Sequence, residues 1–139
     1  MFELAPVSLW LEDYSALKQL FDCWRADGVT DIRDHLAQDA ARLRQCSASL
    51  KVLKVNQRTL DLLAAANQQE LEANLGKVFR DDMHDAVANE LAQLWSGRLE
   101  FSNQTVNYAL DGRRLDVQIH ARILPGYEDS WSRVLVSLE

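Results

Sequence analysis

Several features that mark specialised protein classes are scarce or missing in this chain of 139 residues. The two cysteines, Cys23 and Cys46, are too few for a disulfide framework and have no metal-ligand spacing. We interpret them as reduced thiols of a cytoplasmic protein. Acidic residues outnumber basic ones by 21 to 15, and the net charge is −6. This balance argues against a nucleic-acid-binding face and against docking on anionic membranes.

Long apolar runs are also missing. No run approaches the ~18 residues of a membrane span, and residues 1–4 have neither the basic start nor the apolar stretch of a signal peptide. Hydrophobic residues make up 47% and charged residues 26% of the chain, as in ordinary globular proteins. The length predicts a single domain over residues 1–139.

The last third of the chain carries the strongest pattern. Residues 98–110 and 114–123 are strand-like runs joined by Asp111-Gly112, and a third run covers 131–138. An Asp-Gly pair between such runs predicts a hairpin with a type I′ turn, in which both central residues have positive φ. Three antiparallel strands that follow a helix-rich region predict an α+β fold.

The parity of these strands predicts which residues face the core. Apolar residues alternate cleanly along 114–123, whereas along 98–110 the parity of Phe101 is opposite to that of Val106 and Tyr108. A bulge near Asn103 and Gln104 would reconcile the two halves of that strand. We therefore expect Tyr108 to face the core.

Earlier segments alternate between strand and helix signals. Strands are predicted at 5–11 and 50–55, with a helical region at 12–49 between them. Acids at 12–13 would begin its first helix, and Thr30 or Asp31 would cap its second. Asn56 is expected to cap the helix after the second strand, and Asp81 and Asp82 the long helix that ends at Gly97.

The order of these elements and three short motifs resemble a PAS sensor domain. Residues 55–63, with Asn56, resemble the family's "VN-x-A-x-x-x-L" stretch, 69–76 its "EEL-x-G" helix, and 110–114 its "k-DG" hairpin. Residues 2–15 resemble a bacterial subgroup found ahead of histidine kinases or diguanylate cyclases. The helical insertion at 12–49 departs from the usual short connection.

The resemblance implies a five-stranded antiparallel sheet with helices over its concave face and a small-molecule pocket between them. It also implies a non-catalytic sensor of bacterial signal transduction that forms homodimers. Because the chain stops at Glu139, where the family's linker motif would begin, an output domain is expected in cis after it. The predicted pocket residues, for which a filled core is the alternative, are Leu63, Leu75, Phe79, Trp95, Tyr108, Ile119, Ala121 and Val136.

No cofactor or metal is predicted. The family's photosensing flavin variant needs a reactive cysteine in the mid-chain helices, and residues 57–82 contain none. A haem would need an axial histidine, and His84 lies in an acidic helix start that favours a surface or capping role. Consecutive helical residues point about 100° apart, so Asp81, Asp82 and Asp85 cannot all converge with His84 on a metal, and helix capping is the better interpretation.

Two alternatives to a ligand sensor remain at this stage. One is a ligand-free dimerisation or docking module with a filled core, which would pair subunits through Leu17, Leu20, Phe21 and Trp24. The other is a small α+β lyase or isomerase, which would need an acid such as Asp116 on the core face, whereas strand parity places that residue outside. A pocket of roughly 300 Å³ or more between sheet and helices would favour the sensor.

Overall fold

The computed structural model of the chain describes residues 2, 5–79 and 84–139, without the side chain of His84. It has a five-stranded antiparallel sheet in the order β2-β1-β5-β4-β3. The predicted α+β architecture is confirmed. The strands are β1 (Ser8–Asp13), β2 (Lys51–Val55), β3 (Glu100–Tyr108), β4 (Arg114–Ile123) and β5 (Val134–Leu138).

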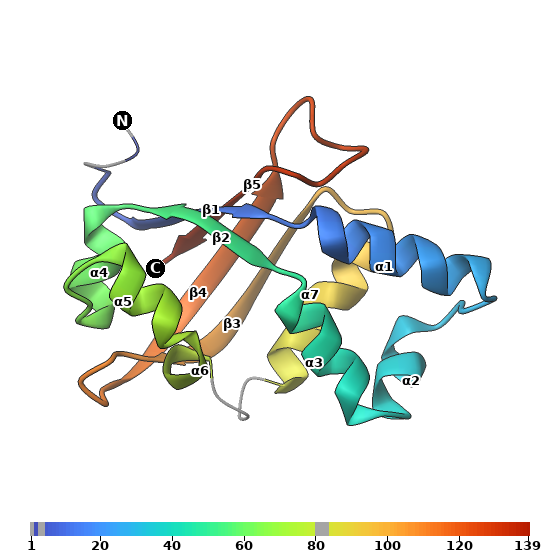
Figure 1. Cartoon of the computed structure of the whole chain (residues 1–139), viewed down its shortest axis with the longest axis horizontal. Coiled ribbons are helices and arrows are strands. Elements are labelled where there is room, and N and C mark those ends of the chain that lie inside the picture. Colours follow the sequence, from blue (N-terminus) through green and yellow to red (C-terminus); the bar gives the residue numbers. More distant parts are fainter. Residues whose placement is uncertain (1, 3–4, 80–83) are drawn as a thin grey trace.

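The helices gather in two groups at the two ends of the sheet (Figure 1). At one end lie the short helices α4 (Gln57–Leu63), α5 (Gln68–Ala73) and α6 (Leu75–Val78). At the other lie α1 (Ser15–Ala26), α2 (Ile32–Ala37), α3 (Ala40–Ala48) and α7 (His84–Trp95). Helix α7 packs against β3 and α2, and α4 packs against β1. Within the described residues, no helix combines the length and apolar character needed to cross a membrane.

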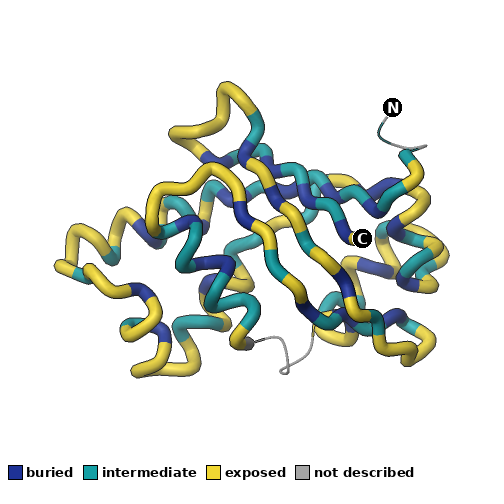
Figure 2. Tube along the Cα trace, turned by 180° about the vertical axis from the view of Figure 1, so that it is seen from behind, coloured by how far each residue is buried: buried dark blue, intermediate teal, exposed yellow. Residues whose placement is uncertain are grey.

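Strands β1, β4 and β5 each have one buried row and one more exposed row of side chains. Buried and exposed residues alternate along β4, and β1 and β5 bury every second residue. Figure 2 shows this alternation along the hairpin of β3 and β4. The inward rows supply much of the core, as Ser8, Trp10 and Glu12 on β1, Val117, Ala121 and Ile123 on β4, and Val134, Val136 and Leu138 on β5.

Strand β3 corrects one sequence prediction. Its pairing with β4 runs in one register from Glu100↔Arg122 to Tyr108↔Arg114, so the predicted bulge near Asn103 is absent from this ladder. Phe101, Thr105 and Asn107 are therefore the buried, inward row, and Tyr108 lies on the opposite face. The prediction failed because it assigned the inward face by apolar character, whereas most of this inward row is polar.

The β3–β4 turn also differs from the predicted type. Gly112 has φ of 94°, but Asp111 does not have positive φ, so the turn is not type I′. Ala109 receives a hydrogen bond from Gly112 and donates one to Arg113, which leaves three residues in the loop. This arrangement is typical of a three-residue hairpin whose last position needs glycine. The amide of Leu110 donates to the Leu63 carbonyl at 2.8 Å, and this contact ties the turn to α4.

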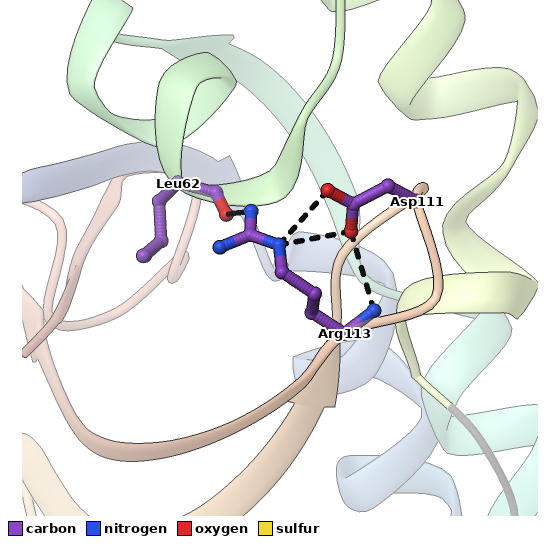
Figure 3. A network of polar contacts seen from close by, with 3 residues as sticks. All are labelled: Leu62, Asp111 and Arg113. Carbon is purple, nitrogen blue, oxygen red and sulfur yellow. Dashed lines mark hydrogen bonds and ion pairs between the residues drawn. The ribbon is translucent and has the colours of Figure 1, made fainter.

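Arg113 makes a second link between this turn and α4. Its Nε atom donates to both carboxylate oxygens of Asp111, and its terminal nitrogen donates to the Leu62 carbonyl at 3.4 Å (Figure 3). The backbone amide of Arg113 also donates to Asp111 and holds the pKa of that carboxyl below its usual range. All of these contacts lie at the surface.

Two of the predicted helix caps are confirmed. Asn56 and Asp31 each accept a hydrogen bond from the amide three residues later, at 3.1 Å. The predicted caps Asp81 and Asp82 lie outside the described residues. Glu12 and Asp13, predicted to begin the first helix, are instead the last two residues of β1.

The predicted dimer face on α1 needs correction. Leu17 and Phe21 are fully buried within this single chain, and Leu20 and Trp24 are half-buried. Phe21 packs edge-on against Trp95 and Trp131, at ring distances of 5.1 and 5.9 Å. Leu17 and Phe21 therefore pack into the core of this chain and are not available to contact a partner subunit.

Candidate functional site

A pocket of about 370 Å³ lies between the sheet and the helices. Its floor is the inward face of the sheet, and its walls come from α1, α6, α7 and the end of α3. The lining is mostly apolar, with a short polar end. The residues that line it are Trp10, Glu12, Tyr14, Leu17, Ser47, Ala48, Leu50, Val52, Leu75, Gly76, Phe79, Val87, Glu90, Leu91, Leu94, Phe101, Ile119, Val136 and Leu138.

The polar end is formed by Glu12, Tyr14 and Glu90, which we call the acid cluster. Glu12 ends the inward row of β1, next to a register shift against β2 that falls between Leu11 and Glu12. Such irregularities often re-aim side chains beside functional sites. The Tyr14 hydroxyl donates to Glu12 Oε2 at 3.3 Å, and the Tyr14 amide is held by the Trp131 carbonyl at 2.8 Å.

Glu90 reaches the cluster from α7. Its side chain is more than nine-tenths buried, and its Oε2 atom has no hydrogen-bond partner. A buried carboxyl oxygen without a partner costs free energy, because it has lost its water without replacement. Such a group on a pocket wall is what a bound molecule could satisfy.

Burial raises the pKa of all three side chains in the acid cluster. It raises the pKa of Glu12 to about 7, although the Tyr14 hydrogen bond partly opposes this. Burial and the nearby Glu12 raise the pKa of Glu90 to about 8. The pKa of Tyr14 lies well above its usual value, because the ring is buried beside two acids. Near neutral pH the tyrosine is thus protonated and the two carboxyls are close to their titration points.

A second buried polar group lies at the other end of β1. We call Ser8, Asn56 and Thr59 the Asn56 cluster. The Asn56 side chain accepts from the amides of Leu9 and Thr59 and donates to the Val7 carbonyl at 2.8 Å. The Thr59 hydroxyl donates to the Leu9 carbonyl, and the Ser8 and Thr59 hydroxyls are 2.6 Å apart. This cluster fastens β1 to the start of α4 and is fully hydrogen-bonded.

Four of the eight predicted pocket residues line the pocket, namely Leu75, Phe79, Ile119 and Val136. The other four lie elsewhere. Tyr108 faces away from the helices, because β3 keeps a single register with β4. Ala121 and Leu63 are buried in the surrounding core. Trp95 lies against α1, where it stacks under Arg25 and donates to the Thr30 carbonyl at 3.3 Å.

The acid cluster itself was missed from the sequence, although two signals could have found it. Ser8, Trp10 and Glu12 have the same parity, so a strand extended past Leu11 would have placed Glu12 on the core face. Along α7, Glu90 follows Val87 by three residues and precedes Leu94 by four. That spacing puts the acid on the apolar stripe of the helix.

The lining, as far as the described residues form it, does not fit a flavin nucleotide. A flavin phosphate calls for cationic or backbone donors, and the ring edge alternates donors and acceptors that amide side chains match. None of the described lining residues is Lys, Arg, Asn or Gln, and two are acids. Neither cysteine lines the pocket: Cys23 is exposed on α1, and burial raises the pKa of Cys46 on α3 to about 12.

The other cofactor hypotheses gain nothing from the described residues. The side chain of His84, considered for haem, and the acids Asp81 and Asp82 lie outside them. Across residues 2, 5–79 and 84–139, no three His, Cys, Asp or Glu side chains gather as a metal site would require.

Comparisons with known proteins support the fold. No protein-family model and no curated protein matches the sequence. Among solved structures, the chain resembles the LOV protein of Rhodobacter sphaeroides, with a TM-score of 0.65, 19% identity, and 99% of this chain but only 61% of that one covered. The chain thus spans about three-fifths of the length of that neighbour.

Two further neighbours match the chain over a larger share of their own length. The LOV domain of a blue-light activated histidine kinase from Erythrobacter litoralis has a TM-score of 0.61 and 12% identity, with 97% of this chain and 95% of that one covered. A PAS domain of a transcriptional regulator from Burkholderia thailandensis, solved in complex with ethanol, has a TM-score of 0.58 and 9% identity, with coverage of 99% and 91%. At such low identity these likenesses establish the fold and leave the ligand open.

Proposed function

We propose that this domain, which has the PAS fold, is a sensory module of a bacterial signal-transduction protein that binds a small organic molecule in its pocket. The observation that carries the proposal is the pocket of about 370 Å³ with a polar end, which lies within the range typical of small-molecule sites. The Burkholderia neighbour, solved with ethanol, is an example of this fold holding a small organic molecule.

We propose that β5 would connect this pocket to an output domain in cis. Val136 and Leu138 of β5 line the pocket, and the same strand leads to Glu139 at the end of the chain. Glu139 exchanges two backbone hydrogen bonds with Gln118 of β4, at 2.9 and 3.0 Å. A ligand that bound one arrangement of this strand better than another would shift the population of the two. In the proposed parent protein, a histidine kinase or diguanylate cyclase would read that shift.

The alternative of a ligand-free docking module is weaker on two observations. The interior contains a pocket, and two of the four α1 residues proposed for pairing are buried within the chain. A homodimer therefore remains part of the proposal only through some other surface.

A thermal-shift screen of the domain against a metabolite library tests the proposal. A ligand at 100 times its dissociation constant should add about 2.7 kcal/mol of stability. The Ile119→Phe variant should lose the shift, because the larger ring fills the pocket. Leu115→Phe is its matched control: Leu115 is also half-buried on the inward row of β4, but it does not line the pocket.

Two results would count against the proposal. One is the lack of any stabilising compound across a broad library. The other is a ligand whose shift survives Ile119→Phe and disappears in Leu115→Phe, because it would bind somewhere else.

A further inference from the structure

The acid cluster narrows the chemistry of a pocket ligand. Glu12, Tyr14 and Glu90 are the titratable groups among the described residues that line the pocket, and none of those described residues is a Lys or Arg that would neutralise them. The acids come from different elements, β1 and α7, and the tyrosine from the turn after β1. Neither carboxyl forms an ion pair within the described residues.

From this arrangement we infer that the pocket takes a cationic amine with an apolar body. This inference rests on the proposed small-molecule function of the same pocket. An ammonium group has three N–H donors. One of them would satisfy the unpartnered Glu90 Oε2, and another would reach Glu12, whose Oε2 already accepts from Tyr14.

The rest of the pocket lining favours a ligand whose remaining atoms are apolar. Trp10, Leu75, Phe79 and Ile119 surround the space beyond the acid cluster and contribute only apolar surface, apart from the indole N–H of Trp10. That N–H is already directed to the Ser8 hydroxyl, at 3.2 Å. An aryl or alkyl chain would bury its surface here, whereas a polar body would lose hydrogen bonds to water without replacement.

The negative charge of the acid cluster favours an amine over an anion or a neutral alcohol. Among the described lining residues an anion would meet two carboxyl groups and no Lys or Arg side chain, so its binding would require both acids to stay protonated. A neutral alcohol could donate one hydrogen bond to Glu90 but carries no positive charge to offset the two carboxylates. An ammonium group supplies both, because it donates up to three hydrogen bonds and its positive charge attracts each ionised carboxylate.

This ligand class carries a pH signature with a defined sign. An alkylamine keeps its proton up to a pH near the lysine value of about 10, while Glu12 and Glu90 lose theirs near pH 7 and 8. Binding to the ionised carboxyls should therefore release protons near neutral pH and tighten as the pH rises from 6 to 8.5. An anion should show the opposite trend.

Isothermal titration calorimetry with matched compounds tests the inference. The probes are 2-phenylethylamine, 2-phenylethanol and 3-phenylpropionate, and likewise hexylamine, 1-hexanol and hexanoate. At pH 8.5 the better amine should bind at least tenfold more tightly than its alcohol, and its carboxylate should bind most weakly. Buffers of different ionisation enthalpy should reveal proton release at pH 7.5.

Single substitutions connect the preference to the acid cluster. Glu90→Gln and Glu12→Gln should each weaken amine binding at least tenfold at pH 8.5 while leaving the alcohol nearly unchanged. Glu72→Gln, an exposed acid on α5, is the control and should behave as the wild type does.

The inference is overturned if neither amine binds more tightly than its alcohol, or if both Gln variants keep the amine preference. Failure of the cation preference is distinguishable from failure of the proposed function. In the first case the alcohols, the carboxylates or other library compounds still stabilise the wild type and lose their effect in Ile119→Phe. In the second, no compound of the library does.

Discussion

Ser8 and Glu12 lie on the same face of β1, four residues apart, but their surroundings are opposite in character. Ser8 belongs to the Asn56 cluster, in which the polar groups of Asn56 and Thr59 have partners at 2.6 to 3.1 Å. Glu12 belongs to the acid cluster, in which one oxygen of Glu90 has no partner and both acids lie at one end of a mostly apolar pocket.

This difference shows that buried polar groups can either hold two elements together or bind a ligand. In a network such as the Asn56 cluster every buried polar group already has a hydrogen-bond partner. The network fixes the position of a strand relative to a helix and has no free donor or acceptor for a ligand. An unsaturated cluster costs stability in the empty protein and can recover that cost when a ligand arrives. Trp10 connects the two, because its indole donates to Ser8 while its ring lines the pocket.

The largest effect is expected from Asn56→Ala. The variant leaves the Leu9 and Thr59 amides and the Val7 carbonyl without their partner and removes the cap of α4. At 1–3 kcal/mol for each buried unsatisfied group, the loss in free energy of unfolding should be on the order of 3–5 kcal/mol. Urea denaturation followed by far-UV circular dichroism measures it.

Asn67→Ala is the matched control for this first prediction. Asn67 also caps a helix, through the Glu70 amide at 2.8 Å, but it is exposed. Its loss should cost only about 1 kcal/mol. Equal effects of the two substitutions would contradict the structural role assigned to the Asn56 cluster.

The second prediction concerns the pH dependence of stability. Glu12 has a folded pKa of about 7 against an ordinary value of 4.5, so between these values the folded state holds a proton that the unfolded state has lost. Stability therefore falls as the pH rises through this window, by about 1.4 kcal/mol per pH unit, or on the order of 3 kcal/mol from Glu12 alone. Glu90 extends the fall to about pH 8.

The Glu12→Gln/Glu90→Gln double variant should remove most of this slope, because neither amide titrates. Urea denaturation from pH 5.5 to 8.5 measures the free energy of unfolding of both proteins, with Glu72→Gln as the control that keeps the wild-type slope. If the double variant loses stability over this range as steeply as the wild type, the acids of the pocket are not the groups that titrate.

A third, smaller effect is expected where the pocket meets the surface. Phe79 lines the pocket with 41% of its surface exposed, and its ring lies 5.9 Å from that of Trp10. Phe79→Ala should cost about 1 kcal/mol through the lost aromatic pair and should change tryptophan fluorescence. Phe101→Ala, in the buried part of the same pocket, should cost about 3 kcal/mol or more. A Phe79 effect as large as that of Phe101 would mean that the rim is as tightly packed as the floor.

The sequence predicted the helix cap at Asn56 and missed the acid cluster for a physical reason. An asparagine between a strand and a helix is a local capping signal, and the cap at Asn56 is confirmed. Glu12 has no local signal of that kind. Its burial depends on β5, β2 and α7 meeting around it, and a sequence pattern that treats acids as solvent-exposed places it at a helix start instead.

The prediction that Tyr108 faces the core was wrong for a related reason: the inward face of the strand was assigned from its apolar residues. Val106 and Tyr108 look like an inward row, but the inward row of β3 holds Thr105 and Asn107. The clean parity of β4 predicted Ile119 correctly as a pocket residue, because there the inward row is uniformly apolar. Sequence periodicity therefore predicted the apolar walls of the pocket and missed its polar end.

The smallest effect is expected from Arg113→Ala, which extends the comparison to polar contacts that are not buried. Arg113 bonds to Asp111 and to the Leu62 carbonyl, but both side chains are about half exposed, so water can replace every contact that is lost. The hairpin keeps its backbone bond from Leu110 to Leu63. The melting temperature should therefore stay within error of the wild type at 0.5 M salt. A drop as large as that of Asn67→Ala would show that this surface link holds the hairpin on α4.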